Sequence, residues 1–106
     1  MAAAAAIDAM VRAIVEHVSP EKVILFGSHA RGSAGPDSDV DLLVVLRDVT
    51  NPRSKAKELY LLLAESGIPK DIVVVTPEEV AAYRDVPGTL IKPALLEGKV
   101  LYERVA

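Results

Sequence analysis

The fold is decided by residues 22–46, which read KVILFGSHARGSAGPDSDVDLLVVL. Two apolar runs, Val23–Phe26 and Val40–Leu46, stand on either side of a segment of small and polar residues. Short runs rich in Val, Ile and Leu, bounded by glycine or proline, predict buried strands. We therefore expect two core strands, joined by a loop that carries glycine, serine and charged side chains.

Helical patterns stand on both sides of these strands. Apolar residues recur at three- and four-residue spacing from Ile7 to Val18, which predicts a helix that Ser19-Pro20 ends. A second helix is expected to start at Asn51-Pro52 and to stop at Gly67. Its inner face would carry Ala56, Leu59, Tyr60 and Leu63.

The last part of the chain predicts a third strand, two short helices and an edge strand. The apolar run Asp71–Val75 predicts the third strand. Thr76–Glu79 has the pattern of a capping box with proline in the first turn, so a short helix begins there. A last helix is expected over Leu90–Glu97, with Gly98 as its terminator, and Lys99–Arg104 is expected to add an edge strand. Helices that alternate with strands in this way predict an α/β (α+β) fold with helices packed on a small sheet.

Composition limits the class of protein. A chain of 106 residues suits one compact domain, which we expect to cover residues 1–106. The absence of cysteine excludes a disulfide scaffold and a zinc site built on thiolates. The net charge of −3 argues against a broad nucleic-acid footprint, and no stretch is long and apolar enough to span a bilayer. We expect a soluble cytoplasmic protein with neither direct nucleic-acid binding nor membrane insertion.

Three aspartates carry the candidate chemistry. Side chains alternate across a strand, so Asp39 and Asp41 lie on one face and repel each other unless a cation lies between them. Mg²⁺ is the natural candidate, because it prefers one or two carboxylates together with phosphate oxygens and water. If the third strand lies beside the second, Asp71 joins them. Three carboxylates suit two metals about 3.5–4 Å apart, an arrangement used for displacement at phosphorus, with one aspartate available as a base.

Gly27-Ser28 predicts a phosphate site beside these aspartates. A glycine directly after a buried strand lets backbone amides approach a phosphate, and the Ser28 hydroxyl adds a donor. If Ser28–Gly32 forms a helical turn, its free amides also favour an anion. Arg31 has two readings that the sequence leaves open, a contact to phosphate or a salt bridge to one of the aspartates.

The chain resembles a known family in these same residues. FGSHARG at 26–32, followed by DSDVDLLV at 37–44, is similar to the DNA polymerase β-like nucleotidyltransferase superfamily and to its minimal nucleotidyltransferase branch. The resemblance covers nearly the whole chain, ending with LEGKVLY at 96–102. It implies a small mixed β-sheet flanked by helices. His29 departs from the longer basic residue that many relatives carry, so no phosphate contact is assigned to it.

The resemblance also implies roles for the site residues. Gly27 and Ser28 would bind the triphosphate of ATP, Asp39 and Asp41 would bind Mg²⁺, and Asp71 would complete the metal-binding triad and act as base. Members of this branch resemble the antitoxin half of a two-protein module. The partner this implies is a HEPN-domain ribonuclease toxin, held in a hetero-oligomer and neutralised by transfer of AMP from ATP to one of its tyrosines.

Two other functions stay open at this point. The chain is compatible with an antitoxin that covers its toxin without significant catalysis. Transfer to RNA or a small molecule is disfavoured by the acidic charge and by a length that predicts no second domain to hold such an acceptor. A partner surface is expected from Val80, Leu90, Leu95 and Leu96 if the last helices expose them.

Overall fold

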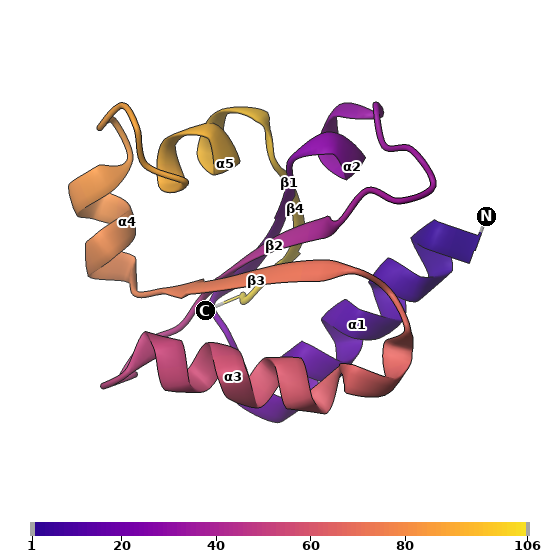
Figure 1. The fold of residues 1–106 in the computed structure, drawn as a ribbon. Coiled ribbons are helices and arrows are strands. Elements are labelled where there is room, and N and C mark those ends of the chain that lie inside the picture. The colour runs from indigo at the N-terminus through magenta and orange to yellow at the C-terminus, as the bar shows by residue number, and fades with distance from the viewer. Residues whose placement is uncertain (1, 106) are drawn as a thin grey trace.

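The computed structural model describes residues 2–105. Over these residues the chain forms a four-stranded sheet in the order β3-β2-β1-β4, flanked by helices (Figure 1). The elements are α1 (Ala2–Val18), β1 (Lys22–Phe26), α2 (Ser28–Arg31), β2 (Val40–Val45), α3 (Pro52–Leu62), the 3₁₀ turn η1 (Ala64–Ser66), β3 (Lys70–Val75), α4 (Pro77–Tyr83), α5 (Ile91–Glu97) and β4 (Lys99–Glu103). The predicted α/β (α+β) class is confirmed, and the predicted elements follow one another in the predicted order.

The sheet is mixed, as expected. β2 pairs antiparallel with β1 and parallel with β3, while β4 pairs antiparallel with the other side of β1. Two parallel neighbours need a crossover connection, and α3 supplies it between β2 and β3. The pairing of β4 with β1 confirms the edge strand expected near the end of the chain.

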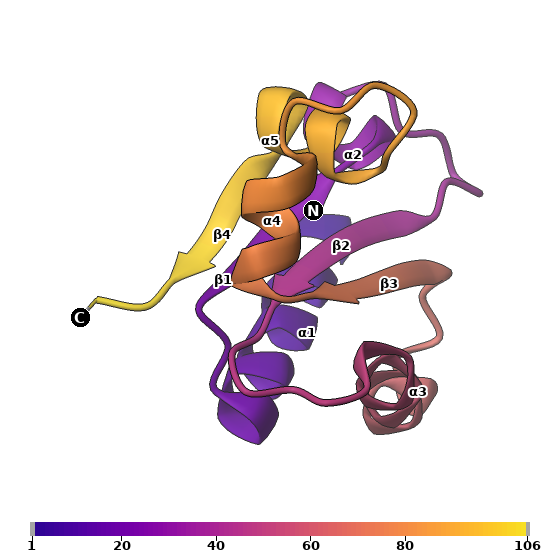
Figure 2. The ribbon, with the colours of Figure 1, turned by 90° about the vertical axis from the view of Figure 1, so that its left-hand side faces the viewer.

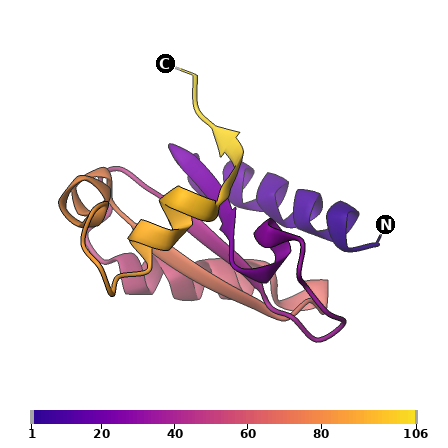
Figure 3. The ribbon, with the colours of Figure 1, turned by 90° about the horizontal axis from the view of Figure 1, so that it is seen from above.

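Helices cover both faces of the sheet. α1 and α3 lie on one face and α4 and α5 on the other, as the turned views show (Figures 2 and 3). The alternating residues of β2 divide between the two cores. Val40, Leu42 and Val44 belong to the core under α1 and α3, and Leu43 and Val45 to the core under α5. No helix within residues 2–105 has both the length and the apolar character that a membrane span requires.

The predicted helix starts are confirmed by their caps. The Asn51 side chain accepts a hydrogen bond from the Ser54 amide at 3.2 Å. Thr76 and Glu79 form the reciprocal capping box, with bonds of 3.1 and 3.0 Å. These bonds satisfy amides that have no partner within the helix, and they fix where α3 and α4 begin.

Gly98 ends α5 for a reason that the sequence did not indicate. Its backbone is extended, with φ of −76°, and does not take the left-handed conformation common at helix ends. A Cβ at this position would lie 2.2 Å from the Ala94 carbonyl oxygen and 2.5 Å from Ile24 Cγ2. Glycine is required here because α5 turns into β4 in close contact with β1.

Candidate functional site

The three predicted aspartates gather at one end of the sheet. The parallel pairing of β2 and β3 places Asp41 directly opposite Asp71. Paired strands lie about 4.8 Å apart, so the two side chains are neighbours. Asp39 stands immediately before the first residue of β2 and two positions from Asp41. The predicted adjacency of the second and third strands is confirmed.

The neighbouring charges and burial shift the pKa of Asp41. Burial raises the pKa of its carboxyl group, and the negative charges of Asp71 and Asp39 raise the same pKa further. The positive charges of His29 and Arg31 act in the opposite direction. The upward direction of the net shift means that like-charge repulsion and lost hydration outweigh the cations nearby, so this end of the sheet favours a bound cation.

Gly27 lies against the Asp41 carboxylate. Because β1 and β2 are antiparallel, the end of β1 lies beside the start of β2. Gly27 has φ of +75°, a conformation that other residues adopt with strain. A Cβ added to it would stand 2.2 Å from Asp41 Oδ2. Sequence reasoning gave Gly27 a phosphate role; the structure adds that its missing side chain makes room for Asp41.

The short helix α2 follows Gly27, which confirms the expected helical turn. Ser28 is its first residue, and the buried Ala30 anchors the turn to the core. Arg31 Nη1 lies 3.4 Å from Glu97 Oε1, with both side chains about half exposed. The salt bridge considered for Arg31 therefore forms with Glu97 of α5 and not with an aspartate. Sequence reasoning did not single out Glu97, because its approach to α2 depends on the docking of α5.

His29 contacts the loop that leads to the aspartates. Its Nε2 atom lies 3.3 Å from the carbonyl oxygen of Ser38, the residue before Asp39. This contact links α2 to the segment that positions Asp39.

Tyr60 does not lie on the inner face of its helix as predicted. Its side chain is 36% exposed and reaches the start of β3. The Tyr60 hydroxyl donates to Asp71 Oδ1 at 3.1 Å and accepts from the Ile72 amide at 2.8 Å. The signal that sequence reasoning passed over is the hydroxyl itself, because a tyrosine beside a core needs a polar partner at its tip.

The donors at this site suit a hard cation but do not form a complete cage. Within residues 2–105, no group of three or more His, Cys, Asp or Glu side chains stands in a ready metal-binding arrangement. The aspartates contribute carboxylate oxygens only. Mg²⁺ commonly binds through one or two carboxylates and takes its other ligands from water and substrate phosphates. The residues present therefore fit a magnesium site that a bound triphosphate would complete.

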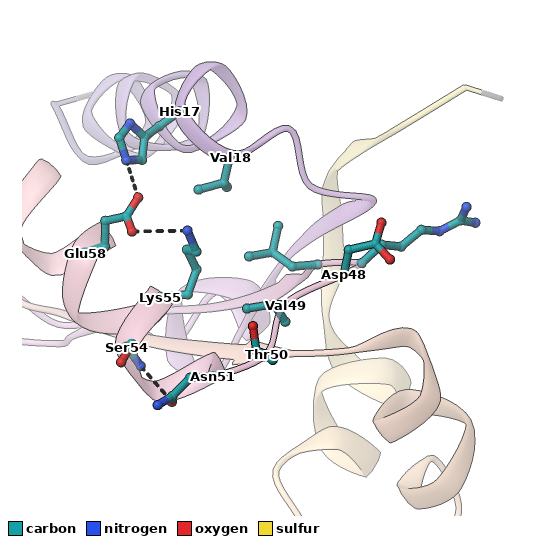
Figure 4. A pocket seen from close by; sticks show the side chains of 11 residues that line it. His17, Val18, Asp48, Val49, Thr50, Asn51, Ser54, Lys55 and Glu58 are labelled. Atoms are coloured by element: carbon teal, nitrogen blue, oxygen red, sulfur yellow. Dashed lines mark hydrogen bonds and ion pairs between the residues drawn. The ribbon is translucent and has the colours of Figure 1, made fainter.

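A separate cavity of about 440 Å³ lies at the other end of β2 (Figure 4). It is lined by the loop at residues 46–51 and by the adjoining ends of α1 and α3. Glu58 pairs there with His17 at 2.6 Å and with Lys55 at 3.1 Å. The pair with His17 ties α1 to α3, whereas Lys55 lies on α3 itself. The cavity has no part of the aspartate cluster in its lining.

The apolar residues suggested as a partner surface are divided by the structure. Leu90 and Leu96 are 53% and 74% exposed. Val80 and Leu95 pack against the core under α5 instead. Two of the four residues thus remain available at the surface.

Comparison with known proteins defines the family. Residues 7–102 match the family described as "Nucleotidyltransferase domain". The match covers most of the chain, so the chain belongs to this family and carries its nucleotidyltransferase domain. The minimal-nucleotidyltransferase resemblance drawn from the sequence agrees with it.

One curated relative and three solved structures refine the comparison. A protein of Methanocaldococcus jannaschii, provisionally named a protein adenylyltransferase, is 35% identical over 57 residues. That match spans 54% of this chain and only 56% of the relative. A toxin–antitoxin structure with AMP-PNP has a TM-score of 0.60 at 20% identity, covering 92% of this chain and 73% of that one.

Two further structures share the fold. A toxin–antitoxin complex named MntA–HpeT, carrying two aspartate-to-glutamate substitutions, has a TM-score of 0.58 at 19% identity, again covering 92% of this chain and 73% of that one. A protein of Sulfolobus solfataricus, provisionally described as a nucleotidyltransferase, has a TM-score of 0.53 at 22% identity, covering 93% of this chain and 87% of its own. At these identities the structures establish a common fold.

Proposed function

We propose that this nucleotidyltransferase uses Mg²⁺ to transfer AMP from ATP to a tyrosine hydroxyl of a cytoplasmic HEPN-domain toxin, and so acts as the antitoxin. The observation that carries the proposal is the meeting of Asp41, Asp71 and Gly27 at one end of the sheet. The carboxylates offer a cation site, and the turn after Gly27 offers backbone amides to a phosphate.

The donor set assigns the residues to two tasks. Asp39, Asp41 and Asp71 would hold Mg²⁺, which when bound neutralises triphosphate charge and lowers the pKa of an attacking hydroxyl. Gly27 and Ser28 would hold the triphosphate through backbone amides and the serine hydroxyl. In this scheme Arg31 leaves Glu97 to meet phosphate oxygens, an exchange made easy by the exposure of both side chains.

Transfer requires the proton of the acceptor to leave as the new bond forms. The acceptor oxygen attacks the α-phosphorus, the bond to the pyrophosphate oxygen breaks, and pyrophosphate departs. We assign the proton to the Asp71 carboxylate, which stands at the rim of the cluster and is exposed to an incoming acceptor. Asp41 is more enclosed and suits a holding role.

The partner rests on what the similar proteins are called. The curated relative is named for protein adenylyl transfer, and two of the structures with this fold are toxin–antitoxin complexes. One of these complexes was made with a nucleotide analogue and another with two aspartates changed, which supports a nucleotide- and aspartate-dependent function. The exposed Leu90 and Leu96 supply apolar surface for a protein partner.

The test is incubation with Mg²⁺, ATP labelled at the α-phosphate, and the protein encoded next to this one. We expect label on a tyrosine of that protein, detected by intact mass and peptide mapping. Asp39→Asn/Asp41→Asn should lower transfer at least about 100-fold, because the site loses its cation ligands. Asp48→Asn is the matched control, since Asp48 lies at the opposite end of β2.

The outcomes separate the candidate functions. Absence of label, with a stable complex that still silences the partner, would leave an antitoxin that works by binding alone. Label on an RNA or a small molecule in the same reaction would show that the acceptor is not a protein. Equal transfer by the double variant and by Asp48→Asn would remove the aspartates from the site.

A further inference from the structure

We propose that Tyr60 is a positioning residue of the transfer site, whose hydroxyl fixes the Asp71 carboxylate and leaves its second oxygen for the reaction. The inference rests on the proposed function for the role of Asp71. Its physical basis is a pair of hydrogen bonds outside the motif that carried the family resemblance.

The two hydrogen bonds fix the direction of the Tyr60 proton. A phenolic hydroxyl has a single proton to donate. The Ile72 amide is itself a donor and occupies the acceptor side of the oxygen at 2.8 Å. The proton of Tyr60 is therefore directed to Asp71 Oδ1, which lies 3.1 Å away.

The tyrosine is held by a rigid part of the fold. β3 is the outermost strand on its side of the sheet, so its outer amides have no partner strand. α3 packs along β3, and the neighbouring Leu59 and Leu63 are buried in the core. The helix thus delivers the hydroxyl to one place on the sheet edge, where it joins Ile72 and Asp71.

Asp71 differs from the other two aspartates in this respect. Within residues 2–105, it is the one member of the cluster whose carboxylate accepts a hydrogen bond from a side chain. With Oδ1 engaged by Tyr60, rotation of the carboxylate breaks a bond. Oδ2 is then the oxygen left for both tasks assigned to Asp71, holding the cation and taking the proton of the acceptor hydroxyl. A base held in one orientation shortens the search for the reactive geometry.

The kinetic test compares Tyr60→Phe with Tyr102→Phe, which removes a hydroxyl on the opposite edge strand. For Tyr60→Phe we expect kcat of labelled-AMP transfer to fall about 10- to 100-fold, as for other partners that orient functional carboxylates. KM for ATP should stay within about twofold, because triphosphate binding at Gly27 and Ser28 is untouched. Tm should stay within about 10 °C of the control, the scale of the two hydrogen bonds that the hydroxyl makes with Asp71 and Ile72.

Two kinetic results would overturn the proposal. One is a kcat within twofold of the Tyr102→Phe value. The other is a fall of kcat together with a rise in KM and a large loss of Tm, since that pattern reports damage to the fold and not to the orientation of Asp71.

An activity-free test uses NMR on the protein without nucleotide. Three-bond couplings report whether the Asp71 side chain keeps one χ1 rotamer. We expect one rotamer in the wild type and averaging among rotamers in Tyr60→Phe, with Asp39 unchanged. If Asp71 stays fixed in the variant, the positioning role is wrong. If the wild type transfers no AMP while these couplings behave as expected, the proposed function fails and the Tyr60–Asp71 contact stands.

Discussion

At the scale of single residues, the site is defined by the space around Asp41. Its carboxylate oxygen occupies the position that a side chain at residue 27 would need. The glycine and the aspartate therefore depend on each other, although their expected ligands differ, phosphate for Gly27 and a metal ion for Asp41. A change at either residue alters the position available to the other.

Gly27→Ala should be costly for this reason. The variant places a methyl group against Asp41 Oδ2 and also forces alanine into a backbone with φ of +75°. We expect a loss of about 2–4 kcal/mol in the free energy of unfolding, combining backbone strain with overpacking. Urea unfolding followed by circular dichroism measures it.

The matched control is Gly67→Ala. Gly67 has a similar φ of +70°, but no atom lies within 4 Å of the place that an added methyl group would take. Gly67→Ala should lower the free energy of unfolding by only about 1 kcal/mol. Adding Asp41→Ala to Gly27→Ala should recover the difference between the two glycine variants. Equal losses of stability for Gly27→Ala and Gly67→Ala would mean that the Asp41 side chain moves away from the added methyl group without destabilising the fold.

Single residues also show how far sequence reasoning reaches. The alternation of side chains along a strand was enough to group Asp39 with Asp41, and the position of Asp71 at the head of the next apolar run added the third. The Tyr60 hydroxyl indicated a polar contact, but the partners of Tyr60 and Glu97 could not be predicted, because each residue meets its partner only when its helix docks. Helical spacing placed Tyr60 on the inner face of α3, whereas its hydroxyl bonds to the Asp71 carboxylate and the Ile72 amide at the edge of the sheet.

At the scale of elements, α1 and α3 are linked by one carboxylate. Glu58 accepts hydrogen bonds from Lys55 on its own helix and from His17 on α1. These two hydrogen bonds lower the pKa of Glu58 below its ordinary value of 4.5. The bond from Lys55 has the larger effect, and the bond from His17 comes second. A group with a lowered pKa stabilises the fold above its unfolded pKa, and this contribution is lost as pH falls through the lowered value.

Glu58→Gln should therefore lower the thermal stability more at pH 6 than under acid conditions. We expect the variant to melt roughly 1–3 °C below wild type at pH 6, the size of an exposed pair. The gap should begin to close as pH falls below 4.5 and should vanish once pH has passed the lowered pKa of Glu58, where the wild-type carboxyl is also neutral. Thermal melts from pH 3 to 7 measure it. Glu65→Gln, on the exposed turn after α3, is the control. A gap that persists at pH 3 would assign the effect to packing.

Elements were the level at which the sequence was most informative. Periodicity and caps predicted the helices, and the apolar runs predicted β1, β2 and β3. Neighbour relations were less accessible. The adjacency of β2 and β3 could be stated only as a condition, since periodicity indicates which face of a strand is buried but not which strand lies beside it. Gly98 was recognised as a helix end, whereas its tight contact with β1 required the assembled sheet.

At the scale of the whole molecule, ligand binding and folding are linked. A ligand that binds only the folded protein stabilises it. In the proposed function the acidic cluster binds Mg²⁺, and the cation together with the turn after Gly27 binds ATP. At ligand concentrations about ten times Kd, we expect about 1.4 kcal/mol of stabilisation, or a rise in Tm of roughly 5–10 °C. Differential scanning fluorimetry with Mg²⁺, ATP and both together measures it.

The double variant Asp39→Asn/Asp41→Asn supplies the control for this shift. It should show little response to Mg²⁺ and ATP. Its ligand-free Tm should equal or exceed that of the wild type, because the repulsion that raises the Asp41 pKa is removed. A wild-type response that the double variant retains would place the bound ligand elsewhere on the molecule.

The pairing of β4 with β1 has a consequence for synthesis of the chain. Residues 22–25 complete their second edge only with residues 99–103. A growing chain can form the β1–β2 hairpin and dock β3, yet one side of β1 stays open until the last strand has left the ribosome. Open strand edges recruit other chains. The nascent protein is thus most prone to aggregation in the interval before β4 is synthesised. Chaperone binding during this interval would shield the open edge of β1.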